Sequence, residues 1–177
     1  TEVQAKKGFN LIATANDRDK GVHELSSALK RRFNTVILPL PTNLEEEVKI
    51  VKTRVNQLGK GLEIPASMAP IKEIERLVIM FRELRNGQTV DGKTKIKIPS
   101  ATLSTAEAIS VINSGQALAA HFGDGQLKAR DLAAGVLGAI IKDPVNDHPI
   151  WQEYMETILR ERSEWADLYR AFKEIES

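Results

Sequence analysis

Residues 8–41 read GFNLIATANDRDKGVHELSSALKRRFNTVILPLP, and this stretch decides the fold. Residues 9–15 form a nearly continuous apolar run rich in strand-forming residues, which predicts a buried strand. A polar loop follows at residues 16–21, and residues 22–30 then carry apolar side chains at helical spacing. Residues 35–40, TVILPL, predict a second buried strand that the prolines terminate. The order strand, loop, helix, strand is typical of an α/β sheet protein.

Beyond the second strand the apolar pattern becomes helical. Capping residues and glycines mark the ends of the helices predicted there, which span about residues 44–57, 67–86, 104–122, 128–141 and 150–174. Residues 88–98 alternate around Asp91-Gly92, which predicts a β-hairpin. We therefore expect a mainly α fold with a small β component, divided into residues 1–42 and residues 43–177.

The bulk composition narrows the classes of function. The chain has 177 residues, of which 42% are hydrophobic and 28% charged, enough for a buried core with a solvated surface. A formal net charge of +1 gives no general attraction for nucleic acid or an anionic membrane. The absence of cysteine excludes disulfides and fits a reducing compartment, and no apolar run approaches the roughly 20 residues that span a bilayer. We expect a cytoplasmic protein with no nucleic-acid partner and no membrane span.

Residues 87–94, GQTVDGKT, match the phosphate-loop pattern G-x-x-x-x-G-K-[ST] letter for letter. That pattern binds phosphate only between a buried strand and a helix, because the loop amides and the helix N-terminus together hold the anion. Here an amphipathic helix is predicted at residues 76–86, and residues 95–100 alternate and include a proline. The context therefore predicts a surface hairpin and argues against a nucleotide site.

Within residues 8–41, the order ATAN, ALKRRF, PLP resembles the sensor and arginine-finger segment of a MoxR-type AAA+ ATPase. The resemblance implies that Asn16 is sensor 1, an uncharged donor and acceptor for the attacking water or the γ-phosphate. It also implies that Arg32, with Arg31 as second candidate, is the finger that reaches a neighbouring subunit's nucleotide. From the residues alone, Asn16 can equally be a turn residue. Residues 30–32 can be a solvated helix terminus or a weak nucleic-acid patch.

The remaining residues resemble the helical lid of that family, and the two strands then resemble a remnant of its α/β P-loop NTPase sheet. The family's sensor 2 arginine has no counterpart in residues 103–108, LSTAEA. We expect the phosphate loop and the acidic Walker B strand to precede residue 1. ATP and Mg²⁺ would then bind mainly there, the isolated chain would be inactive, and its unpaired strands would self-associate or be disordered. The resemblance further implies a homo-oligomeric ring, by family habit a hexamer, that couples ATP hydrolysis to remodelling of a protein substrate.

The sequence leaves two alternatives open. The chain can be a non-enzymatic helical interaction or adaptor module. The aromatic side chains of the last predicted helix can form either a core face or a docking face for a partner. Pro144 and Pro149 predict an interruption before that helix. His23, His121 and His148 follow no metal-ligand spacing, and we expect surface or core roles for them.

Overall fold

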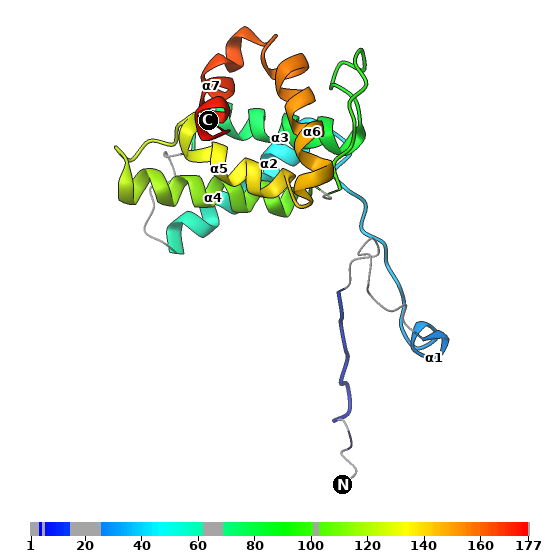
Figure 1. Cartoon of the computed structure of the whole chain (residues 1–177). Coiled ribbons are helices and arrows are strands. Elements are labelled where there is room, and N and C mark those ends of the chain that lie inside the picture. The colour runs from blue at the N-terminus through cyan, green and yellow to red at the C-terminus, as the bar shows by residue number, and fades with distance from the viewer. Residues whose placement is uncertain (1–3, 5, 15–25, 62–68, 101–102, 177) are drawn as a thin grey trace. The chain divides into compact units, whose positions relative to one another are not determined.

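The computed structural model describes residues 4, 6–14, 26–61, 69–100 and 103–176. The chain divides into two units, residues 1–39 and residues 40–177, and each unit is described by itself. Figure 1 draws the elements of both.

The first unit has little regular structure among its described residues, where α1 (Ser27–Lys30) is a single helical turn. The predicted strands at residues 9–15 and 35–40 are not formed in the part of the chain that the structure describes, and Figure 1 draws no strand arrow there. A strand is held by hydrogen bonds to a neighbour and by burial of its side chains, and these segments have neither. Ile12 is 91% exposed and Leu38 is 85% exposed.

The second unit is helical and carries the core. Its elements are α2 (Leu44–Gly61), α3 (Ile71–Asn86), α4 (Thr105–Phe122), α5 (Ala129–Ile140), α6 (Pro144–Tyr154), the π-helical turn η2 (Met155–Leu159), the short 3₁₀ helix η3 (Ser163–Trp165) and α7 (Ala166–Glu176). The most extensive packing joins α4 with α5, α2 with α4, and α5 with α7. These helices agree with the mainly α fold expected from the sequence.

Capping residues fix the ends of these helices as the sequence predicts. The Asn43 Oδ1 atom accepts a hydrogen bond of 2.7 Å from the Glu46 backbone N–H, which satisfies a free donor in the first turn of α2. Ser104 and Glu107 form a reciprocal capping box at the start of α4. Gly87 ends α3 with φ at 70°, a left-handed conformation that glycine adopts without strain.

The prediction of a single C-terminal helix over residues 150–174 is wrong. Instead of interrupting the chain, Pro144 is the first residue of α6, and the Asp143 carboxylate caps it through the N–H groups of the second and third helical residues. The chain then leaves the helix near Arg162, whose backbone is extended at φ −93° and ψ 98°. This break turns α7 back across the domain.

The turn brings the aromatic residues of α6 and α7 into one core. The Trp151 and Phe172 rings meet edge to face with centroids 4.7 Å apart, and both side chains are fully buried. Gly115 allows α4 and α5 to approach closely, because an added Cβ would lie only 3.1 Å from the Asp131 carbonyl oxygen of α5. The face that the sequence left open as core or docking surface is therefore largely core.

The predicted hairpin is reduced to a closed loop. Gln88 and Lys95 form an isolated antiparallel bridge, and no strand extends from it in the described residues 69–100. Side-chain oxygens accept hydrogen bonds from backbone N–H groups that would otherwise be available to pair across a β-ladder. The Thr94 N–H donates to Thr89 Oγ1 at 3.0 Å, and the Lys93 N–H donates to the Asp91 carboxylate at 3.1 Å.

Two phenylalanines test whether the C-terminal aromatic face is core. We expect Phe172→Ala to lower the free energy of unfolding by about 3–5 kcal/mol, because it leaves a cavity beneath Trp151. Phe122 is 87% exposed, so Phe122→Ala is the matched control and should change the free energy by less than about 0.5 kcal/mol. Urea unfolding followed by circular dichroism measures both. Equally small changes would instead assign Phe172 to a surface.

Candidate functional site

The residues that the sequence singled out lie in the first unit. Arg31 and Arg32 directly follow α1 and are exposed, and the Arg31 N–H donates to the Ser27 carbonyl at 3.2 Å. Asn16 lies outside the described residues. The structure therefore places both arginines at the exposed C-terminal end of α1 and leaves their relation to Asn16 as a prediction.

In the second unit, the start of α4 lies against a buried ionic cluster centred on Glu47. The Glu47 carboxylate, 1% exposed, accepts hydrogen bonds from Arg82 at 2.8 Å and from Arg85 at 2.9 Å. The Thr105 hydroxyl, in the first residue of α4, donates to the same carboxylate at 2.8 Å. Arg85 also donates to the Leu103 carbonyl at 2.8 Å, just before the helix begins.

The cluster holds Glu47 in its ionised form. Burial raises the cost of the charge, but the hydrogen bonds from Arg85, Arg82 and Thr105 outweigh it and lower the pKa of Glu47 below its ordinary value of 4.5. The two guanidinium groups are in turn neutralised in part by Glu47. The arginines nearest to the start of α4 are therefore engaged within the domain rather than presented to an external anion.

A second cluster centres on Glu83 of α3. Its carboxylate accepts hydrogen bonds from the Tyr154 hydroxyl at 2.7 Å, from Arg162 at 2.6 Å and from the Val90 N–H at 2.9 Å. Burial and the neighbouring Glu83 charge raise the pKa of the Tyr154 hydroxyl, so it stays a hydrogen-bond donor. This cluster joins α3, the loop after it and the end of α6, and it anchors the turn at Arg162.

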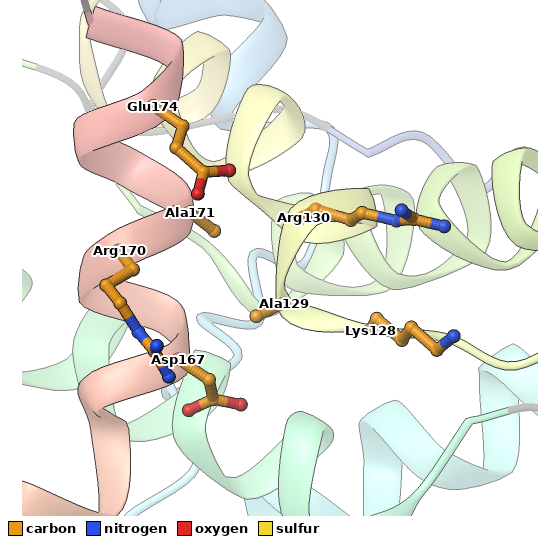
Figure 2. Close-up of a pocket in the computed structure, with 7 residues that line it drawn as sticks. All are labelled: Lys128, Ala129, Arg130, Asp167, Arg170, Ala171 and Glu174. Carbon is orange, nitrogen blue, oxygen red and sulfur yellow. The ribbon is translucent and has the colours of Figure 1, made fainter.

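A pocket of about 330 Å³ lies between the start of α5 and α7 (Figure 2). Ala129 and Ala171 contribute small apolar side chains, and the Lys128 and Arg130 side chains point away from α7. Lys128 pairs with Asp124, and the pocket's Asp167 pairs with Arg76 at 3.1 Å. The charges around the pocket are mixed and do not converge on one point, so the pocket has no clear preference for an anion or a cation.

A helix, α3, precedes the phosphate-loop match at residues 87–94, as the sequence predicts. Gly87 is the cap of that helix, and Lys93 forms an exposed pair with Asp91 at 3.6 Å. The loop closes on itself through the bridge described above rather than opening onto a helix N-terminus. Its geometry favours a surface turn.

Among residues 4, 6–14, 26–61, 69–100 and 103–176, no group of three or more His, Cys, Asp or Glu side chains is placed to hold a metal ion. The helices described within these ranges include none long and apolar enough to cross a membrane. His121 is exposed, His148 Nε2 lies 3.9 Å from a Glu176 carboxylate oxygen, and His23 lies outside the described residues.

Neither ionic cluster was predicted from the sequence. A signal for them does exist, because Glu47 lies four residues before Val51 and so shares the apolar stripe of α2. Arg85 likewise follows the buried Leu84 and lies four residues after the buried Phe81. A charged residue on an apolar stripe indicates a buried partner elsewhere in the chain.

Comparison with known proteins adds family information to this geometry. The family described as "YehL-like AAA+ ATPase C-terminal domain" matches residues 45–176, and the family described as "AAA domain (dynein-related subfamily)" matches residues 1–33. The chain is 34% identical over 175 residues to "Uncharacterized protein YehL" of Escherichia coli (strain K12), covering 97% of this chain and 47% of that protein. The chain thus spans about half the length of this curated relative. No solved structure matches it significantly.

The lowered pKa of Glu47 predicts a pH-dependent stability. Glu47→Gln removes the charge that two nearly buried arginines require, so we expect the free energy of unfolding at pH 7 to fall by about 3 kcal/mol. The contribution of the ionised form is present above the ordinary pKa of 4.5 and is lost as the pH falls through the lower folded value. The difference between wild type and variant should therefore shrink below about pH 4.5.

Urea unfolding at several pH values between 7 and 3 measures this difference. Glu45→Gln is the matched control, since Glu45 is exposed in the same first turn of α2 and should show a small effect at every pH. If the loss of unfolding free energy caused by Glu47→Gln stayed constant from pH 7 to pH 3, the lowered pKa assigned to Glu47 would be contradicted.

Proposed function

Because the chain belongs to the family of YehL-like AAA+ ATPase C-terminal domains, we propose that it forms the C-terminal part of an ATP-hydrolysing machine. In this proposal the helical second unit is the lid of the ATPase, and the first unit belongs to its α/β core. The complete protein is a MoxR-type member that forms a homo-oligomeric ring, a hexamer, in the cytoplasm. It couples ATP hydrolysis to remodelling of a protein substrate.

We assign the reacting groups of this chain to the first unit. Asn16 is the sensor 1 residue, which orients the attacking water through an uncharged amide. Arg32, with Arg31 beside it, is the finger that stabilises the phosphoryl group at a neighbouring subunit, because a guanidinium keeps its charge and presents a fork of donors. The observation that carries this assignment is the AAA domain match over residues 1–33, which includes all three, together with the exposure of both arginines after α1.

ATP and Mg²⁺ are the proposed cofactors, held mainly by parts of the complete protein outside residues 1–177. Mg²⁺ bound to ATP neutralises the charge that develops on the transferred phosphoryl group. The loop at residues 87–94 does not have the strand-and-helix context needed to hold those phosphates. Residues 103–108 contribute no arginine, so this segment supplies no sensor 2 contact in the proposal.

The alternative function is a non-enzymatic interaction or adaptor module made of the same helices. The two functions differ in what Arg32 does. An adaptor has no reaction that depends on this guanidinium, whereas the ATPase loses its turnover when the guanidinium is removed.

The proposal predicts that the isolated chain binds ATP weakly. We expect isothermal titration calorimetry of residues 1–177 with ATP and Mg²⁺ to show no tight binding, because the phosphate-holding groups lie elsewhere. Lys93→Ala should leave this result unchanged. Tight, Mg²⁺-dependent binding that Lys93→Ala abolishes would move the nucleotide site to residues 87–94.

In the complete protein, Asn16→Ala and Arg32→Ala should each lower the ATPase kcat, the second by about 10³-fold or more. Because Asn16 acts on its own subunit's nucleotide and Arg32 on a neighbour's, rings mixed equally from the two variants should recover activity. About one quarter of the sites then combine an intact Asn16 with an intact Arg32.

The variant that carries both substitutions is the control, and it should stay inactive alone or mixed with either single variant. Size-exclusion chromatography verifies that each variant still assembles. Full activity of Arg32→Ala in an assembled ring would remove the finger assignment and favour the adaptor function.

A further inference from the structure

The Arg82 side chain holds the first residues of the second unit. The Arg82 guanidinium donates to the backbone carbonyls of Pro41 at 3.2 Å, Thr42 at 3.1 Å and Asn43 at 3.5 Å. Its side chain is 15% exposed and pairs at the same time with Glu47 at 2.8 Å. One rigid, planar group therefore binds three successive carbonyls and the carboxylate that anchors α2.

The same carboxylate links this connection to α4. Glu47 accepts the Thr105 hydroxyl at 2.8 Å, and Arg85 joins Glu47 to the Leu103 carbonyl. Residues 41–43 are thereby tied through four side chains, those of Arg82, Glu47, Arg85 and Thr105, to the starts of α2 and α4. Residues 34–40, on the other side, are exposed and form no regular structure.

We propose that Arg82 is a positioning residue that makes residues 41–43 part of the rigid helical domain, so that this domain begins at residue 41 rather than at Leu44, where α2 starts. The clamp fixes the direction in which the chain enters α2. Its effect on ATP hydrolysis rests on the function proposed above, whereas the clamp itself does not.

Amide hydrogen exchange on the chain of residues 1–177 tests the clamp directly. Arg82→Gln removes the charge and the fork, and Arg82→Lys keeps the charge but cannot reach three carbonyls. We expect both variants to raise the exchange rates of the hydrogen-bonded amides within residues 42–46, above all that of Glu46, by about tenfold, with the centres of α3 and α4 unchanged.

Arg54→Gln and Arg54→Lys are the matched controls, since Arg54 is an exposed arginine of α2 that bonds Gln57 at 2.7 Å. They should leave residues 42–46 unchanged. A uniform rise across residues 40–177 on Arg82 substitution would make Arg82 an ordinary core residue, and no rise at residues 42–46 would remove the clamp. Either result overturns the proposal.

The complete protein gives the functional test. If the clamp positions the lid, Arg82→Gln and Arg82→Lys lower the ATPase kcat by at least about threefold while the KM for ATP stays within about twofold, and the Arg54 variants do not. An unchanged kcat overturns the positioning role. If the unsubstituted protein hydrolyses no ATP, the proposed function fails, and hydrogen exchange alone then decides the clamp.

Discussion

A carboxylate buried in a protein interior must have its charge matched, and Glu47 meets this requirement with two arginines and one hydroxyl. The rest of the helical unit depends on this arrangement. α2 supplies the carboxylate, α3 supplies the guanidinium groups and α4 supplies the hydroxyl, so the charge network sets how the three helices meet. Apolar packing alone would allow neighbouring registers, whereas paired charges permit few.

The helices could be predicted because their signals are local. The caps at Asn43, Ser104 and Gly87 act within a few residues, and the structure confirms them. The break near Arg162 could not be predicted in this way. Arg162 pairs there with Glu83, which lies 79 residues away in the sequence, and a periodic pattern cannot reveal a partner at that distance.

The predicted strands and the buried charges depend on partners that are distant in the sequence. The apolar runs at residues 9–15 and 35–40 favour a strand, but a strand forms only when it pairs with another strand. Asn16, Arg31 and Arg32 were singled out from the order of short motifs alone, and their roles stay predictions. Glu47 and Arg82 could not, because a charged residue in a helix is usually solvated and its burial becomes visible only when the partner helices are in place.

The clamp on residues 41–43 has an evolutionary consequence. Arg82 contacts main-chain oxygens there, which every residue carries regardless of its side chain. Substitutions at Pro41 or Thr42 can therefore accumulate among descendants of this chain without loss of the attachment. Selection on the connection falls instead on Arg82, which lies in a different helix and some forty positions downstream.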